Sequence, residues 1–534
     1  MTNSDTAMKP VVVNGCFAWL HTPPHAAKNV AVLLCPGAGQ DYLNGYRSLR
    51  VLADGMAQAG YPVLRFDYPG TGDSGDDHGP DLWPAWRRSV AEAADWLRQV
   101  TGARGLILSG LRIGATLAAL EAASRDDVAG LVLFEPILHA RGFVTQLVTE
   151  SRLRRKNPDH SHAPDDSGSV TLGELKFSAA DVAEMRTADL AQLSFSKPLP
   201  VKIFSQNNAA KLNTRLESWR LQEMKPSCSG FENFEALLRP NQHSGESEID
   251  TVALLDWMDQ EVPHGIAQSG VVALPAALKS ENWEEKIIRF GKNARLAGML
   301  CRPRTESTMA VLIGNSGGNP RHGFARFGVV LARALAAAGI ASFRFDFPGL
   351  GDSVHLEDAV DTQSDVFLQD RTEDFSAAID ALEPLGIKHF AVHGLCSGAF
   401  HAVQAARSEP RIETLATVNL PWFTLRHDAP GVNSAAQKAI ATFRQRNMRV
   451  LFLFSTDDAG FRQFERHFGT GGSELGGDPR MRIVVSDIVD HELTERWMQD
   501  IAIRDTIGFL QAHAAGTARN IVRREMPGNS SREA

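Results

Sequence analysis

The fold of this chain is decided by one stretch of nine residues, Ala391-Val392-His393-Gly394-Leu395-Cys396-Ser397-Gly398-Ala399. An apolar run leads into Gly394, and a small-residue helical pattern follows Gly398. Strand, tight turn and helix in this order are typical of a nucleophile elbow, with Cys396 where a serine is usual. The glycines let strand and helix pass closely, and a helix N-terminus favours a negatively charged sulfur. The stretch therefore predicts a reactive cysteine on an α/β fold, with a buried structural cysteine as the alternative.

Length and composition limit the classes to which the chain can belong. Its 534 residues exceed one ordinary core, and 43% hydrophobic and 22% charged residues are typical of a globular protein. The net charge of −8 disfavours nucleic acid as a partner. The five scattered cysteines predict reduced thiols, and we expect no metal site and no cofactor. Neither a signal-like N-terminus nor a membrane-length apolar run occurs, so we expect a cytoplasmic protein without a transmembrane segment.

The chain repeats itself once. An apolar run entering a glycine-bearing loop occurs at 31–37 and again at 310–316. The turn sequence RFDYPGTGDS at 65–74 matches RFDFPGLGDS at 344–353, with the same offset of 279 residues (310 against 31, and 344 against 65). An amphipathic segment lies between these marks in each copy. A fixed offset of this kind predicts two domains, each a mostly parallel sheet with helices on both faces.

The first copy carries an elbow without a nucleophile. Its sequence, SGLRIGA at 109–115, places Arg112 where the second copy has Cys396. After the following strand the first copy has a longer insertion, which we expect to form a cap at about 138–198. The predicted first domain covers 1–265, the second covers 280–515, and 516–534 is predicted to be a flexible tail.

The second copy also supplies an acid and a histidine in the chain order that this fold uses. A strand over 450–454 is followed by two aspartates, of which Asp458 is the expected acid and Asp457 the alternative. A later strand precedes His491, the expected base, which we place at the start of a helix. The expected oxyanion donors are the backbone N–H groups of Gly317 and Ser397.

The residue type at the first elbow predicts a different use. A guanidinium on a helix N-terminus cannot attack a carbonyl carbon, but it matches phosphate and carboxylate groups. The first copy keeps a histidine, His243, and has an amide, Asn208, at the acid position. We therefore predict that Arg112, with His243 as a second contact, binds an anionic group such as a carrier phosphate or a sugar acid. The competing interpretation pairs Arg112 with an acid of its own cap, such as Glu135.

Together these motifs resemble a known family. The second copy, through GGNPRHG at 317–323, RFDFPGLGDS, GLCSGA at 394–399 and Asp490-His491, is similar to the exosortase A system-associated hydrolases of type 1, within the α/β-hydrolase superfamily near the serine aminopeptidase group. The first copy, through GLRIGATLA at 110–118 and EPIL at 135–138, resembles the type 2 group, in which an arginine also stands at the elbow. The resemblance covers nearly the whole chain and implies an association with bacterial exopolysaccharide. This chain departs by fusing the two types and by a serine after the cysteine, where type 1 tends to have an acidic residue.

These observations predict two tandem α/β-hydrolase domains, each with a cap insertion. We expect the second to be a Cys-His-Asp enzyme acting on ester or thioester acyl groups through an acyl-enzyme, by hydrolysis or by transfer. Its substrate would be a small or carrier-bound acyl compound. The alternative is a non-catalytic anion- or carrier-binding scaffold with two degenerate sites.

Overall fold

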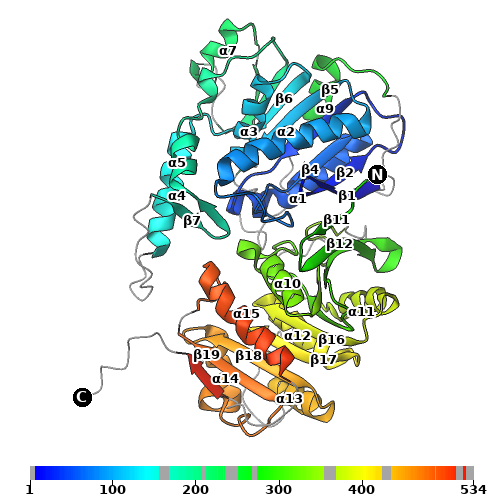
Figure 1. The fold of residues 1–534 in the computed structure, drawn as a ribbon, viewed down its shortest axis with the longest axis vertical. Coiled ribbons are helices and arrows are strands. Elements are labelled where there is room, and N and C mark those ends of the chain that lie inside the picture. Colours follow the sequence, from blue (N-terminus) through cyan, green and yellow to red (C-terminus); the bar gives the residue numbers. More distant parts are fainter. Residues whose placement is uncertain are drawn as a thin grey trace, which may run out of the picture. The chain divides into compact units, whose positions relative to one another are not determined.

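The structure of the protein is a computed structural model (Figure 1). It describes residues 7–155, 168–206, 212, 214–224, 226–231, 234, 251–267, 274–353, 369–421, 423, 434–487, 489–512 and 521–524. The chain divides into two compact units, Met1–Leu278 and Lys279–Ala534. The first unit continues past residue 265, because the Val12 N–H donates to the Pro275 carbonyl and the Ala267 N–H to the Ala27 carbonyl.

The first unit is built on an eight-stranded sheet with the order β1-β2-β4-β3-β5-β6-β9-β10. β2 pairs antiparallel with β1 and with β4, and the other neighbours pair in parallel. The strands are β1 (Ala7–Val13), β2 (Cys16–Thr22), β3 (Val30–Cys35), β4 (Val63–Phe66), β5 (Gly105–Leu111), β6 (Val128–Phe134), β9 (Val201–Ser205) and β10 (Pro226–Gly230).

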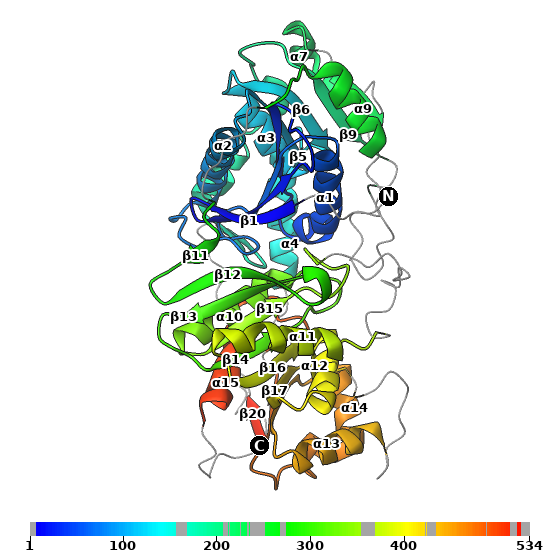
Figure 2. The ribbon, with the colours of Figure 1, turned by 90° about the vertical axis from the view of Figure 1, so that its right-hand side faces the viewer.

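Helices cover both faces of this sheet, and Figure 2 shows α2 on one side of it and α1 on the other. Alternate residues of β3 divide between two buried clusters: Leu33 packs with α2 and α3, whereas Val32 packs with α1 and α9. A strand that is apolar at consecutive positions is expected where both faces are covered. These helices are α1 (Gln40–Gln58), α2 (Leu82–Thr101), α3 (Ile113–Ala123) and α9 (Thr251–Glu261).

An insertion between β6 and β9 lies where the cap of the first domain was expected. Asp181 in this insertion accepts hydrogen bonds from the N–H groups of Leu82 and Trp83, so it caps the first turn of α2. The insertion comprises α4 (Ala140–Arg155), the hairpin β7 (Val170–Leu172) and β8 (Leu175–Phe177), α5 (Ala179–Met185) and η1 (Leu190–Gln192). A further short helix, α7 (Glu217–Leu221), follows β9.

The second unit is built on a ten-stranded sheet with the order β11-β12-β13-β15-β14-β16-β17-β18-β19-β20. β13 pairs antiparallel with β12 and with β15, and the pairs from β15 through β20 are parallel. The strands are β11 (Ala277–Lys279), β12 (Trp283–Phe290), β13 (Leu296–Pro303), β14 (Met309–Ile313), β15 (Ala341–Phe345), β16 (His389–Leu395), β17 (Ile412–Val418), β18 (Arg449–Ser455), β19 (Met481–Ser486) and β20 (Ile521–Arg524).

Helices also cover both faces of the second sheet. Val392 of β16 packs into a cluster with α11 to α14, whereas its neighbour Ala391 packs with α10 and α15. Of the helices in the part of the chain that the structure describes, none is long and apolar enough to cross a membrane. The helices of this unit are α10 (Phe327–Ala337), α11 (Thr372–Leu382), α12 (Ser397–Ser408), α13 (Ala435–Gln445), α14 (Ala459–Phe468) and α15 (Arg496–Gln511), with short 3-10 turns η2 (Lys292–Ala294), η3 (Phe324–Arg326), η4 (Glu383–Leu385) and η5 (Thr470–Gly472).

The two sheets share one topology. In each, an antiparallel N-terminal segment is followed by parallel strands. The order of two strands is reversed relative to the sequence, so that β3 lies between β4 and β5, and β14 lies between β15 and β16; β5 and β16 are the strands that end at the elbows. An elbow between such a strand and a helix is the central feature of the α/β-hydrolase fold. This arrangement confirms the predicted fold class, two tandem α/β-hydrolase domains.

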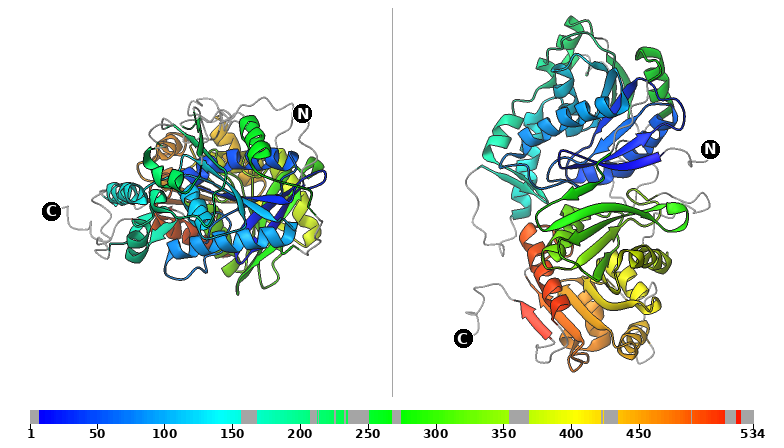
Figure 3. Two further views of the ribbon diagram at one scale, coloured as in Figure 1. Left: turned by 90° about the horizontal axis from the view of Figure 1, so that it is seen from above. Right: turned by 45° about the vertical axis from the view of Figure 1, so that its right-hand side comes forward.

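Part of the predicted flexible tail is structured. Ile521–Arg524 forms β20, which lies at the edge of the second sheet (Figure 3). It pairs in parallel with β19, with Ile521 opposite Ile483. β-branched residues such as Ile521 and Val522 favour an extended strand over a disordered tail. The tail prediction for 516–534 is therefore wrong at 521–524, and its other residues lie outside those described.

Candidate active site

The two elbows have the same backbone conformation. Cys396 lies between β16 and α12 with φ 54° and ψ −124°, and Arg112 lies between β5 and α3 with φ 55° and ψ −116°. Positive φ is strained for a residue with a Cβ, and such strain gathers at functional sites. The Cys396 N–H donates to the Val418 carbonyl at 3.0 Å, and the Arg112 N–H donates to the Phe134 carbonyl at 2.9 Å. In each domain the next strand therefore anchors the strained turn.

The glycines that flank each elbow are required by close backbone contacts. A Cβ on Gly394 would lie 2.2 Å from the Gly398 carbonyl oxygen, and a Cβ on Gly398 would lie 2.8 Å from the Asn315 carbonyl oxygen. In the first domain a Cβ on Gly114 would lie 2.1 Å from the Pro36 carbonyl oxygen. The pattern of glycines thus records how closely strand, helix and loop approach one another.

Asp458 is the carboxylate that meets the histidine. It caps the N-terminus of α14, where its Oδ1 accepts from the Gly460 N–H at 2.7 Å, and its Oδ2 accepts from His491 Nδ1 at 2.5 Å. Its side chain is 5% exposed. Asp457, the alternative acid, is exposed, and its carbonyl oxygen accepts from Arg462.

His491 lies in a turn and not at the start of a helix. α15 begins only at Arg496, because Leu493 has φ 54° and the Asp490 carboxylate accepts the Thr494 N–H in a local turn. The hydrogen bond with Asp458 and, second, the hydrogen bond with Cys396 raise the pKa of His491 to about 10. At neutral pH the imidazole therefore carries a proton that it can donate to a reacting group.

Cys396 differs from the other cysteines in its surroundings. Its thiol is partly exposed and interacts with His491. Burial raises the pKa of every other thiol and keeps it in the unreactive neutral form. These thiols belong to Cys16, Cys35, Cys228 and Cys301.

The two expected oxyanion donors come from adjacent backbone segments, but one is already engaged. The Gly317 N–H donates to the Ser397 hydroxyl oxygen at 2.7 Å, across 80 residues of chain. Ser397 is the first residue of α12, where helix geometry leaves the backbone N–H without an intrahelical acceptor. Gly317 can serve a substrate only by exchanging the Ser397 hydroxyl for the substrate oxygen, and a charge-assisted bond to an oxyanion is the stronger of the two.

One residue of this site was missed by the sequence reasoning. Asn419 directly follows β17, is fully buried and contacts both the strand end that leads to Asp458 and the turn that carries His491. Its Oδ1 accepts from Ser455 at the end of β18, and its Nδ2 donates to the backbone carbonyls of Asp490 and His491. The only signal in the sequence is a polar residue directly after an apolar strand.

The first domain places an ion pair at its elbow. Arg112 Nε donates to Asp41 Oδ2 at 3.3 Å, and the guanidinium lies 5.7 Å from the centroid of the Phe234 ring. Asp41 belongs to the first turn of α1, and burial raises its pKa although Arg112 acts in the opposite direction. Glu135, which the competing interpretation offered as the partner of Arg112, instead accepts from the Gln206 N–H with its carboxylate. His243 and Asn208 lie outside the described residues.

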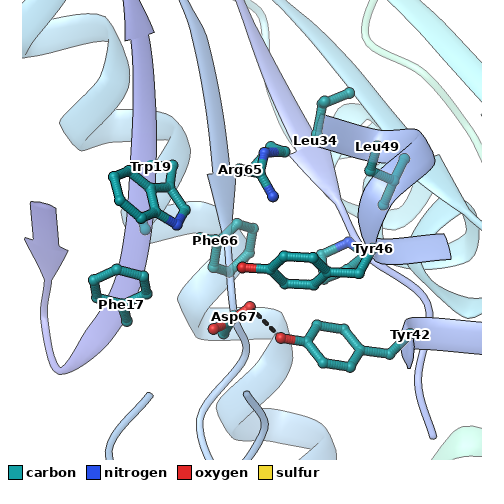
Figure 4. Close-up of a pocket in the computed structure, with 11 residues that line it drawn as sticks. Phe17, Trp19, Leu34, Tyr42, Tyr46, Leu49, Arg65, Phe66 and Asp67 are labelled. Carbon is teal, nitrogen blue, oxygen red and sulfur yellow. Dashed lines mark hydrogen bonds between the residues drawn. The ribbon is translucent and has the colours of Figure 1, made fainter. Parts of the chain in front are cut away.

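The repeated turn sequence has a structural role in both domains. Asp67 Oδ2 accepts from the Asp73 N–H at 2.9 Å, and its Oδ1 accepts from the Tyr42 hydroxyl at 2.7 Å (Figure 4). In the second domain Asp346 accepts from the Asp352 N–H and from Arg321. The turn of the first domain borders a small pocket, whose lining includes Trp19 and Tyr46. Neither Arg112 nor Asp41 is among the described residues that line it.

Comparisons with known proteins return matches among solved structures. No protein-family model and no curated protein matches the chain. The chain is similar to DcsB in a complex with a substrate analogue, with 14% identity and a TM-score of 0.34 over 48% of this chain and 100% of that one. It is also similar to an esterase from Pyrococcus furiosus, with 11% identity and a TM-score of 0.33 over 48% and 92%. An esterase domain from Rhodothermus marinus matches with 17% identity and a TM-score of 0.32 over 43% and 100%.

Proposed function

We propose that the second domain is an acyl-transferring enzyme that cleaves ester or thioester bonds with Cys396 as its nucleophile. The observation that carries this proposal is the hydrogen bond between His491 and Asp458 at 2.5 Å, together with the strained elbow that presents the partly exposed Cys396 and the contribution of Cys396 to the raised pKa of His491. In a degenerate site, nothing would keep these side chains close enough to interact. The geometry therefore favours catalysis over the scaffold alternative.

The reaction follows from the roles of these three side chains. The Cys396 sulfur attacks the acyl carbonyl carbon, and the carbonyl oxygen becomes an oxyanion facing the Ser397 and Gly317 N–H groups. The C–O or C–S bond then breaks, while protonated His491 gives its proton to the leaving alkoxide or thiolate. Water or another acceptor next loses a proton to His491 and attacks the carbonyl carbon of the thioester; the C–S bond breaks, which releases the acyl group and leaves Cys396 as a thiolate beside protonated His491, the state in which the cycle began. Asp458 keeps the imidazole oriented and stabilises its charged form.

The substrate class follows from the nucleophile and from the resemblance. Exchange between a thiolate and a thioester is nearly balanced in energy, so carrier-bound thioesters are suitable donors. The resemblance to the exosortase A system-associated hydrolases favours a role in the biosynthesis of exopolysaccharide or a related metabolite.

The first domain lacks this chemistry in our proposal. A guanidinium stays protonated and cannot serve as a nucleophile, and Arg112 is paired with Asp41 where the other domain presents a thiol. Anion binding by Arg112 stays a prediction.

Turnover of an activated ester tests the proposal directly. We expect p-nitrophenyl acetate to acetylate Cys396, which mass spectrometry of a quenched digest detects as a peptide adduct. Cys396→Ala should abolish the adduct and the turnover, and His491→Ala should slow acylation by several orders of magnitude. Arg112→Ala is the matched control at the other elbow and should leave the rate unchanged. Full turnover by Cys396→Ala, or an adduct only on another residue, would refute the proposal.

A further inference from the structure

We infer that Asn419 is a positioning residue of this site, which fastens the histidine loop to the strand end that precedes the acid. The inference rests on the proposed function, because it assigns Asn419 a part in holding His491 against Asp458. Among the described residues, the Asn419 side chain hydrogen-bonds to Ser455, Asp490 and His491 and not to Cys396. It acts through the two loops that carry the catalytic side chains.

The Asn419 side chain uses all of its hydrogen-bonding groups. Its Oδ1 accepts from the Ser455 N–H at 2.7 Å and from the Ser455 hydroxyl at 3.1 Å. Its Nδ2 donates to the Asp490 carbonyl at 3.2 Å and to the His491 carbonyl at 3.0 Å. An amide offers two acceptor sites and two donor hydrogens, so this arrangement is complete. Aspartate would turn a carboxylate oxygen toward two carbonyls, and an apolar residue would leave all four groups unpaired at a buried position.

The oxygen and the NH2 group of the Asn419 amide bind different loops, one that leads to Asp458 and one that carries His491. Ser455 ends β18, and the chain reaches Asp458 three residues later. On the other side, His491 lies in a turn outside any helix, and its side chain is 42% exposed. Packing alone holds such a side chain weakly, so its contact with Asp458 depends on where the backbone of the turn is fixed. Asn419 fixes that backbone at His491 itself.

In the first domain the position that corresponds to Asn419 is occupied by Glu135, whose carboxylate has no N–H group to donate. Glu135 follows β6 as Asn419 follows β17, and the two residues have φ 41° and 48°. The Glu135 N–H donates to Phe204 as the Asn419 N–H donates to Leu453. Its carboxylate accepts from the Gln206 N–H at 2.8 Å, which corresponds to the bond at Ser455. A carboxylate cannot donate to a neighbouring carbonyl, so the bond to a histidine loop is a property of the domain that carries Cys396, His491 and Asp458.

Two variants distinguish the role of the Asn419 NH2 group from that of the whole side chain. Asn419→Gly tolerates the positive φ and removes the whole side chain. Asn419→Asp keeps the shape and the acceptor for Ser455 but loses the donors to the histidine loop. Glu135→Gly is the matched control, because it removes the corresponding side chain from the domain without a nucleophile.

The first readout needs no substrate. The rate at which iodoacetamide alkylates Cys396 is measured between pH 4 and 11, because this rate depends on the protonation of His491 beside the sulfur. We expect Asn419→Gly to lower the apparent pKa of His491, because the imidazole loses its close contact with Asp458. The second readout is acylation by p-nitrophenyl acetate, which we expect to fall about 100-fold, as a misplacement of roughly 1 Å does. Glu135→Gly should change neither the alkylation profile nor the acylation rate, even if it lowers Tm by as much as Asn419→Gly does.

The outcomes distinguish this inference from the proposed function. If the wild-type protein acylates Cys396 and both Asn419 variants keep its alkylation profile and acylation rate within twofold, the inference is overturned. If the wild-type protein fails to acylate Cys396, the proposed function is wrong, and the alkylation profile alone decides whether Asn419 positions His491. If Asn419→Gly does not fold, Asn419→Asp decides in the same way, with a wild-type profile counting against the inference.

Discussion

Asp458→Asn is the sharpest perturbation of the site, because one carboxylate serves two partners. Oδ1 accepts from the Gly460 N–H as the cap of α14, and Oδ2 accepts from His491 Nδ1. Asparagine caps a helix about as well as aspartate, so the substitution keeps the helix start while it removes the charge. An amide has a single oxygen, so while it caps Gly460 it turns its NH2 group toward His491. The imidazole then faces a donor where it needs an acceptor.

The magnitude follows from the state of the histidine. The pKa of His491 is about 10 against an ordinary value of 6.5, with Asp458 as the largest cause and Cys396 as the second. A hydrogen bond to a charged group contributes about 1.5 to 3 kcal/mol, and a side chain that is 42% exposed places this one near 2 kcal/mol after solvent screening. At 1.36 kcal/mol per pKa unit, we expect the pKa of His491 to fall by about 1.5 and kcat/KM to fall roughly 30-fold.

The assay pairs this variant with Asp457→Asn, which removes the same charge one residue away. kcat/KM for p-nitrophenyl acetate is measured for both, together with Tm from pH 6 to pH 10. A histidine whose pKa is raised by folding contributes stability below pH 6.5 that is lost as the pH rises toward 10. The Tm difference between wild type and Asp458→Asn should therefore shrink over this range. An equal or larger activity loss in Asp457→Asn would refute the assignment of the acid.

Three further predictions test other parts of the chain. Iodoacetamide at pH 7 should label Cys396 first, because burial raises the pKa of the other four thiols, and peptide mapping that finds another cysteine labelled first in the folded protein contradicts this. Burial lowers the pKa of His393 to about 4, so the unfolded chain binds this proton more tightly and stability should drop by about 3 kcal/mol between pH 7 and pH 4. Measured by urea denaturation, the free energy of unfolding should fall less between pH 7 and pH 4 in His393→Leu than in the wild-type protein. An equal fall in both proteins would exclude this histidine as a cause. Arg112→Ala in a Cys396→Ala background should weaken binding of coenzyme A or uronic acids in calorimetric titration, whereas equal binding would leave Arg112 only as the ion-pair partner of Asp41.

The sequence alone was sufficient for the fold and for the elbow. Gly394, Cys396 and Gly398 specify a strand, a strained turn and a helix within five residues, because the steric rules that demand glycine act between neighbours in the chain. The constant offset of 279 residues predicted two domains, because the same short motifs, each local in the chain, occur once in each copy.

Only the tertiary structure decided which polar groups meet. Arg112 pairs with Asp41 and not with Glu135, and Asn419 reaches across 72 residues to the backbone of His491. These partners are far apart in the chain and are brought together by strand order, which places the ends of parallel strands at one edge of the sheet. Residue spacing favoured Asp458 but left Asp457 open as the alternative. Their side chains leave the backbone in different directions, and the direction is set by the start of α14, which turns Asp458 inward as its cap.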